Sequence, residues 1–233
     1  MINNQLMDSL EKEGRNQLTE VEAKNLLQEA GVPVVRTELA RNKKEAISIS
    51  KEIGFPIVMK IVSPDITHKS DVGGVKLGLR NNTQVEKAYA EMMSTIKSKC
   101  PQARIEGVSI QRMVSPGVEV VIGMTRDPQF GSLLMFGLGG VLVELMKDVS
   151  FRIVPVGKKD AKEMIEKLKT FPLLKGYRGR EPVDILFLEE MIVKVSEFIE
   201  KSPELKELDI NPIFAYGKGA IAVDARILIE PFS

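Results

Sequence analysis

The pattern of hydrophobic and polar positions predicts alternating helices and strands in the first half of the chain. A helix is expected over 19–31, because Thr19 and Glu22 have the spacing of a capping box and Gly31 is a natural helix stop. The run PIVMKIV at 56–62 is apolar except for Lys60, as in a buried strand. The other elements expected here are helices over 42–54 and 83–99, the second with a capping box at Thr83 and Glu86, and strands over 32–39 and 75–79.

The second half of the chain is richer in β-structure. Apolar runs separated by Gly, Pro and Asp predict a mostly antiparallel sheet. These runs cover 104–114, 117–127, 130–140 and 151–156. Two helices are expected next, around 158–169 and 183–200, followed by two closing strands over 206–214 and 220–227. This mixture of units predicts an α+β protein with two interleaved lobes.

The two closing strands suggest a metal site. If Gly217 and Lys218 form a two-residue hairpin turn, counting outwards from the turn pairs Asn211 with Asp224 on one face of the ribbon. Their Cβ atoms would then lie about 5 Å apart, a separation that one cation can bridge through oxygen ligands. Mg²⁺ is held by one or two such ligands together with substrate phosphates. The alternative is a hairpin whose polar residues simply face water.

Two charged residues interrupt apolar strands. Lys60, as a buried ammonium, would need a carboxylate or phosphate partner, unless its side chain reaches the edge of the sheet. Glu119 interrupts GVEVVIG in the same way, or faces solvent in an alternating strand.

Familiar nucleotide motifs are missing: there is no P-loop, and GLGGVL has Leu142 where the dinucleotide fingerprint requires Gly or Ala. Hydrolase motifs such as G-x-S-x-G are missing too.

His68 is the single histidine of the chain, and it lies in the polar, turn-rich segment SPDITHKSDVGGV at 63–75. A lone histidine is usually a solvated surface residue.

Composition narrows the possible partners: 33 basic and 32 acidic residues give a net charge of +1, which provides no electrostatic case for nucleic acid or an anionic membrane. The lone Cys100 excludes an intrachain disulfide and fits a reducing compartment. The N-terminus lacks the order of a signal peptide, and the most apolar run, 133–143, is too short to span a bilayer, so a cytoplasmic protein is expected.

Several of these segments together resemble the ATP-grasp subunit of ADP-forming acyl-CoA synthetases, the family that includes the ADP-forming acetate–CoA ligases. The likeness runs from about residue 18 to 227 and, more distantly, extends to the nucleotide-binding subunit of succinyl-CoA synthetase. It is carried by FPIVMK, THKSDVGGVKLG, GVEVVIGM, FGLGGVLVELMKD and LDINPIFAYGKGAIAVDARI. The resemblance implies an ATP-grasp fold, with nucleotide between a lobe formed by 1–20 and 111–233 and a lobe formed by 21–110.

The resemblance also implies roles for individual residues. Those that bind ATP or ADP are Lys60 at the phosphates, the backbone of Gln111, Arg112, Met113 and Val114 at adenine, and Glu119 at the ribose. Asn211 and Asp224 match the Mg²⁺ ligands, in agreement with the hairpin pairing.

His68 matches the histidine that is transiently phosphorylated, although the distant succinyl-CoA relatives lack a histidine in the equivalent loop. Asp209 lies where the wider group has an acidic residue near the phosphohistidine. A neutral imidazole is a nucleophile near pH 7, and Gly73 and Gly74 are expected hinges for the loop.

The implied activity is that of an acid–thiol ligase, acyl-CoA + ADP + Pi ⇌ carboxylic acid + CoA + ATP, with phosphoryl passing through His68. A CoA-binding alpha subunit would bind acyl-CoA and the acid, in a heterotetramer with two copies of each subunit. Two alternatives remain open: a self-sufficient ATP-grasp carboxylate ligase, which would not need His68, and a nucleotide-sensing module without turnover. The identity of the acid and the preference for adenine or guanine are not readable from the sequence.

Overall fold

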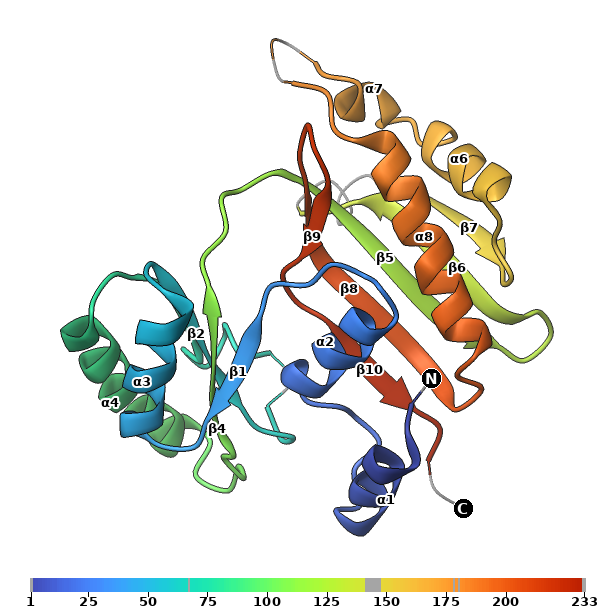
Figure 1. Cartoon of the computed structure of the whole chain (residues 1–233). Coiled ribbons are helices and arrows are strands. Elements are labelled where there is room, and N and C mark those ends of the chain that lie inside the picture. The colour runs from blue at the N-terminus through green and yellow to red at the C-terminus, as the bar shows by residue number, and fades with distance from the viewer. Residues whose placement is uncertain (1, 67, 141–147, 178, 180, 232–233) are drawn as a thin grey trace. The chain divides into compact units, whose positions relative to one another are not determined.

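The computed structural model describes residues 2–66, 68–140, 148–177, 179 and 181–231, which fold into two compact units (Figure 1). Unit 1 comprises Met1–Leu18, Glu22–Val34 and Pro116–Ser233, and unit 2 comprises Thr19–Val21 and Val35–Ser115. The segment 22–34 belongs to unit 1, whereas the expected lobes placed it with 21–110. It does so because Leu26 and Leu27 of its helix pack into the larger apolar core.

Unit 2 is a four-stranded antiparallel sheet in the order β1-β4-β2-β3, with two helices packed against it (Figure 1). Its elements are β1 (Thr37–Ala40), α3 (Lys43–Ile53), β2 (Ile57–Val62), β3 (Val75–Leu79), α4 (Asn82–Lys99) and β4 (Gly107–Arg112). Helix α3 is capped by Asn42 and stops at Gly54, where φ is 85°. Helix α4 begins one residue earlier than expected: Asn81 caps it by accepting from the Gln84 amide, so the expected capping box at Thr83 and Glu86 is wrong.

Unit 1 contains a larger antiparallel sheet in the order β10-β8-β5-β6-β7, with β9 also paired to β8. Helices α6 and α8 lie side by side against this sheet (Figure 1). Its elements are α1 (Asn4–Lys12), α2 (Glu20–Glu29, whose first two residues belong to unit 2), β5 (Val118–Asp127), β6 (Gly131–Leu138), β7 (Val149–Ile153), α6 (Lys158–Glu166), α7 (Phe171–Leu174), α8 (Ile185–Glu200), β8 (Leu205–Ala215), β9 (Ala220–Ala222) and β10 (Arg226–Ile229).

The predicted antiparallel sheet is therefore present, with two differences from the sequence-based elements. The expected strand over 220–227 is divided into β9 and β10, with 223–225 between them outside regular structure. Helices α1 and α7 were not predicted. Asn3 caps α1 by accepting from the Leu6 amide, and the buried Leu10 anchors the helix in the core of unit 1.

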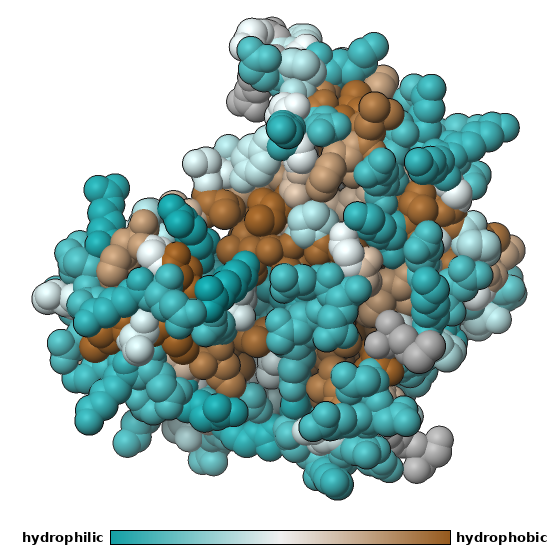
Figure 2. All heavy atoms as spheres, viewed as in Figure 1, coloured by the Kyte–Doolittle hydropathy of each residue, from teal (hydrophilic) through white to brown (hydrophobic). Residues whose placement is uncertain are grey.

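Hydrophilic side chains cover most of the face seen in Figure 2, and hydrophobic side chains show there in separate patches. The large apolar side chains that are exposed, such as Leu77, Phe130 and Leu186, come from different parts of the chain. Within the described residues, none of the helices combines the length and the apolar character needed to cross a membrane.

Candidate functional site

Lys60 is buried in β2 and paired with a carboxylate. Every residue of β2 is buried, and Lys60 itself is 6 % exposed, so its side chain does not reach solvent at the edge of the sheet. Its Nζ lies 2.7 Å from Oε1 of Glu20, the first residue of α2. The Glu20 side chain is also buried. Of the two partners predicted for this ammonium, the structure provides the carboxylate. Contact with a phosphate stays a prediction.

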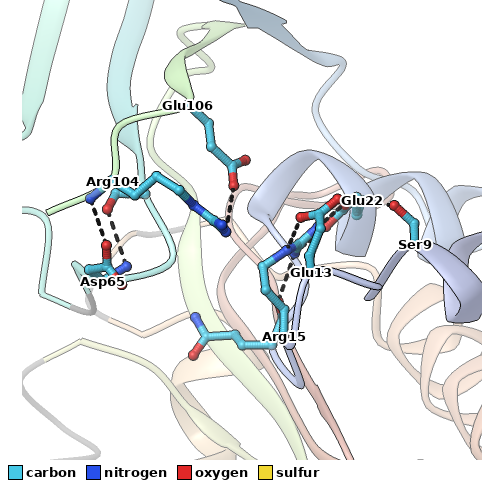
Figure 3. Close-up of polar contacts among 9 residues, drawn as sticks. Ser9, Glu13, Arg15, Glu22, Asp65, Arg104 and Glu106 are labelled. Atoms are coloured by element: carbon cyan, nitrogen blue, oxygen red, sulfur yellow. Dashed lines mark hydrogen bonds and ion pairs between the residues drawn. The ribbon is translucent and has the colours of Figure 1, made fainter. Parts of the chain in front are cut away.

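His68 is exposed, and the chain is fixed on both sides of it. Before it, Asp65 Oδ2 accepts a hydrogen bond from the Arg104 amide at 2.6 Å (Figure 3), and Ile66 is buried in the core of unit 2. After it, Lys69 Nζ lies 3.2 Å from Glu20 Oε2. An exposed imidazole between two fixed points is accessible to a phosphoryl donor. Phosphorylation of His68 stays a prediction.

The two glycines of this segment have different structural requirements. Gly73 has a φ of 78°, which glycine adopts without strain. Gly74 is closely packed: a Cβ atom there would lie 2.5 Å from Ile61 Cγ2 and 2.9 Å from the Lys69 carbonyl oxygen. Gly74 is thus required for close packing against β2, and a hinge role for either glycine remains untested.

The segment 111–114 lies at the end of β4 in unit 2. Gln111 is buried, and its Oε1 accepts from Thr37 Oγ1 at 3.2 Å, which fixes its side chain inside the unit. Arg112 and Met113 are exposed, and Val114 is half-buried. The Met113 amide donates to the Pro56 carbonyl at 2.9 Å, so this amide is already used within unit 2. Contact of the segment with adenine stays a prediction.

Glu119 is exposed near the start of β5 and lies against two glycines. Its carbonyl accepts from the Gly139 amide at 2.7 Å, and a Cβ atom on Gly140 would lie 2.7 Å from Glu119 Oε2. Glycines at 139 and 140 therefore let the chain approach this carboxylate closely. The GLGG motif indicated this close approach, but sequence reasoning compared it only with the dinucleotide fingerprint. Leu142, on which that comparison depended, lies outside the described residues.

The hairpin register that the sequence predicted is confirmed. Ala215 pairs with Ala220 and Ile213 with Ala222, and the Tyr216 amide donates to the Gly219 carbonyl across a turn formed by residues 217–218. The Val223 amide still follows this register by donating to the Pro212 carbonyl at 2.9 Å.

The same register returns beyond the break between β9 and β10, where Arg226 pairs with Asp209. Counting from the hairpin turn and counting from the pair of Arg226 and Asp209 therefore both place Asn211 opposite Asp224. Asn211 is exposed and Asp224 half-buried.

The donor chemistry at this position fits Mg²⁺, since an amide oxygen and a carboxylate are hard ligands. Among the described residues, no cluster of three or more His, Cys, Asp and Glu side chains is placed to hold a metal ion. A cation at Asn211 and Asp224 would therefore need further oxygens, such as those of a nucleotide's phosphates. Their role as metal ligands stays a prediction.

Asp209 lies on the same side of β8, next to this pair. Loss of water around its carboxylate, and then the negative charge of Asp224, raise the pKa of Asp209, while the Arg226 guanidinium lowers it. Although the side chain is exposed, neighbouring protein atoms exclude part of its water. A shallow cavity of about 130 Å³ adjoins it, lined by Met124, Thr125, Glu207, Leu208, Asp209, Arg226 and Leu228. An anionic group with a raised pKa beside a proposed metal site is typical of a functional position.

Asp184 holds the hairpin turn, and sequence reasoning missed it. Its Oδ1 caps α8 by accepting from the Phe187 amide, and its Oδ2 accepts from the Gly219 amide at 3.0 Å. Its own amide donates to the Tyr216 carbonyl at 2.8 Å. An aspartate just before a helix is a recognisable N-cap signal. Its second role could not be read locally, because Gly219 is distant in the sequence.

Arg15 forms a second ion-pair cluster, in unit 1 (Figure 3). Its guanidinium binds Glu13 at 2.7 Å and both carboxylate oxygens of Glu22 at 3.1 and 3.2 Å. Burial lowers the pKa of Arg15, but the hydrogen bonds to Glu22 and Glu13 outweigh it and keep that pKa above its ordinary value. The cluster fixes α2 to the segment that follows α1. Glu22 is a partner of Arg15, and the capping box expected for it with Thr19 stays a prediction.

Comparison with known proteins identifies the family. Residues 9–229 match the ATP-grasp domain family. The beta subunit of ADP-forming acetate–CoA ligase I from Pyrococcus furiosus is 52 % identical over 212 residues, which is 91 % of each chain. ADP-forming acetate–CoA ligase I from Archaeoglobus fulgidus is 46 % identical over 88 % of this chain, which covers only 30 % of that longer protein.

Solved structures agree with these relatives. The dinucleotide-forming acetyl-coenzyme A synthetase 1 of Candidatus Korarchaeum cryptofilum, in complex with coenzyme A and Ca-AMPCP, matches with a TM-score of 0.94 and 47 % identity over 97 % of this chain and 99 % of that chain. The same enzyme with coenzyme A and Mg-AMPPCP has a phosphohistidine segment pointing towards its nucleotide-binding site. It matches with a TM-score of 0.86 and 45 % identity over the same shares of the two chains. The expected fold is confirmed, and the chain belongs to the ATP-grasp family, among the beta subunits of ADP-forming acetate–CoA ligases.

Proposed function

We propose that this chain is the nucleotide-binding subunit of an ADP-forming acyl-CoA synthetase that runs acyl-CoA + ADP + Pi ⇌ carboxylic acid + CoA + ATP. The observation that carries the proposal is the register that sets Asn211 opposite Asp224, with Asp209 beside them. Two hard oxygen ligands at one hairpin position fit the metal of a bound nucleotide. A hairpin with a purely structural role would not need them.

Each residue has a defined part in this proposal. Asn211 and Asp224 would hold Mg²⁺, which neutralises phosphate charge when bound. Lys60 would contact the phosphates and Glu119 the ribose, while the backbone of 111–114 would contact adenine. Because phosphoryl transfer depends mainly on positioning and electrostatic stabilisation, these residues need to orient the nucleotide rather than react with it.

His68 would carry the phosphoryl group. In the direction of ATP hydrolysis, a neutral imidazole nitrogen attacks the γ-phosphorus, an N–P bond forms, and the P–O bond to ADP breaks, so ADP leaves with the electron pair. In the direction of ATP synthesis the same bonds form and break in reverse. By its resemblance to the family, Asp209 would be the acidic residue that acts near the phosphohistidine.

A separate alpha subunit completes the enzyme in this proposal. The Pyrococcus relative is itself a beta subunit, and the longer Archaeoglobus relative has room for further domains in one chain. The partner would bind coenzyme A, the acyl group and the acid, in a complex with two copies of each subunit in the cytoplasm.

The test is ATP synthesis by the purified chain with and without a CoA-binding alpha subunit of this family. With acetyl-CoA, ADP, phosphate and Mg²⁺, the chain alone should form no ATP, and the partner should restore synthesis. Sustained ATP formation by the single chain would contradict the proposal and favour a self-sufficient ligase. Nucleotide binding without turnover in both samples would favour a sensing module.

A further inference from the structure

One buried carboxylate joins two lysines in unit 2. Glu20 is 5 % exposed; its Oε1 lies 2.7 Å from Lys60 Nζ, and its Oε2 lies 3.2 Å from Lys69 Nζ. Ser109 Oγ is 3.5 Å from the same Oε2. The two oxygens of Glu20 thus contact the lysine proposed for the nucleotide phosphates and the lysine next to His68. We call this arrangement the Glu20 bridge.

The main chain of the His68 segment is attached at the same place. The Lys69 carbonyl accepts from the Gly74 amide at 2.7 Å, and the Gly74 carbonyl accepts from the Ile61 amide at 2.8 Å. Ile61 directly follows Lys60 in β2. Lys69 is therefore held next to β2 through both its backbone and its side chain, whereas the imidazole of the preceding residue is exposed.

We infer that Glu20 is a positioning residue that couples the phosphate-binding lysine to the segment carrying His68. The inference rests on the proposed function. Through the bridge, Glu20 orients Lys60 and keeps Lys69, and with it His68, close to Lys60. Because one buried carboxylate pairs with both ammonium groups, a substitution of Glu20 affects Lys60 and Lys69 together. Loss of Lys69, in contrast, should affect the segment and leave Lys60 paired.

The experiment compares four variants with the wild-type chain. Lys69→Met keeps most of the apolar stem and removes the charge, Lys69→Arg keeps the charge, and Glu20→Gln alters both arms of the bridge. The matched control is Lys76→Met, which removes a lysine paired with Glu91 at 3.3 Å on the surface of the same unit. Three quantities are measured: hydrogen exchange of the Gly74 amide, affinity for Mg-ADP, and the rate of His68 phosphorylation by ATP.

The Gly74 amide should exchange about tenfold faster in Lys69→Met, because a charge-assisted hydrogen bond that holds its acceptor residue is lost. Phosphorylation at saturating ATP should slow by about the same factor, since the His68 segment is no longer held close to Lys60, while the affinity for Mg-ADP stays unchanged. Lys69→Arg should restore both quantities. Glu20→Gln should in addition weaken Mg-ADP binding, and Lys76→Met should resemble the wild type.

An unchanged Gly74 exchange rate in Lys69→Met would overturn the inference. So would equal slowing of phosphorylation in Lys69→Met and Lys76→Met. Failure of the proposed function has a different signature: the wild-type chain itself would take no phosphoryl label. Hydrogen exchange needs no turnover, so it decides whether Glu20 holds the segment even in that case.

Discussion

Arg226 of β10 faces Asp209 of β8 in the same register that joins β9 to β8 across the hairpin turn. Both short strands therefore lie along one edge of β8, and the irregular residues 223–225 between them face 210–212. This continuity places Asn211 opposite Asp224, in the interval between the two paired stretches. It also brings Asp224 close enough to Asp209 for its negative charge to raise the pKa of Asp209, after the larger effect of burial.

Asp224→Asn should weaken binding of Mg-ADP at least tenfold, equivalent to about 1.4 kcal/mol, because the substitution removes a charged oxygen ligand. Binding of metal-free ADP should change much less. Titration calorimetry with and without Mg²⁺ measures both affinities. Glu230→Gln, which neutralises an exposed carboxylate just after β10, is the control and should change neither. Equal losses for the two forms of ADP would mean that Asp224 has a structural role.

Asp209→Asn should stabilise the folded chain at neutral pH. The pKa of Asp209 is raised in the folded state above its ordinary value of 3.8, so the folded state binds its proton more tightly than the unfolded state does. Ionisation of Asp209 therefore lowers the free energy of unfolding as pH rises from about 4. The gain in the variant should stay below about 1 kcal/mol, since the side chain is exposed.

Urea unfolding of the wild type and Asp209→Asn at several pH values measures this difference. It should be largest at pH 7 and should disappear below the ordinary pKa of an aspartate, where both side chains are neutral. A difference that grows as the pH falls would show that the ionised carboxylate is stabilising, and would contradict the sign of the shift.

Asp184→Ala should lower the free energy of unfolding by about 1–2 kcal/mol, since α8 loses its N-cap. It should also weaken Mg-ADP binding, because the Gly219 amide loses the acceptor that holds the hairpin turn. The matched control is Asp160→Ala: Asp160 Oδ2 accepts from the Gly157 amide at the start of α6, away from the hairpin. That variant should lose stability and keep its nucleotide affinity. Equal affinities for Mg-ADP in the two variants would show that Asp184 does not contribute to the nucleotide site.

Gly74→Ala should destabilise the chain by about 1–3 kcal/mol, because the added methyl group overlaps Ile61 and the Lys69 carbonyl. Phosphorylation of His68 in the displaced segment should also be slower. Gly157→Ala is the comparison: a Cβ atom there meets Asp160 at an ordinary 3.5 Å, so this variant loses only the preference for glycine at the N-cap of α6. Thermal unfolding followed by circular dichroism compares the two. A wild-type melting temperature in Gly74→Ala would show that the segment is free to move away from β2.

The sequence predicted those features that depend on local chemistry. The apolar run around Lys60 predicted a buried strand, and the Gly217-Lys218 turn predicted the hairpin register, because a tight turn fixes the pairing of the strands beside it. The break between β9 and β10 was not predictable, since AIAVDARI reads as one alternating strand.

Contacts between distant segments were the other features that sequence reasoning missed. Glu20 and Lys60 are 40 positions apart, and nothing in either segment indicates that they meet. The role of Asp184 at the hairpin turn depends on tertiary packing in the same way, since Gly219 is 35 positions away. Helix α1 has a local signal in its Asn3 N-cap, which sequence reasoning did not use, and the buried Leu10 anchors it in the core of unit 1.

The proposed function depends on phosphorylation of His68 by ATP. The wild-type chain, given Mg²⁺ and ATP with a radiolabelled γ-phosphoryl group, should take up label that is stable in base and lost in acid, as expected for a phosphorylated imidazole. His68→Ala should take up none, and ADP added to the labelled wild type should remove the label as ATP. Label that persists in a folded His68→Ala chain, or a wild-type chain that binds Mg-ATP and takes up no label, would contradict the account.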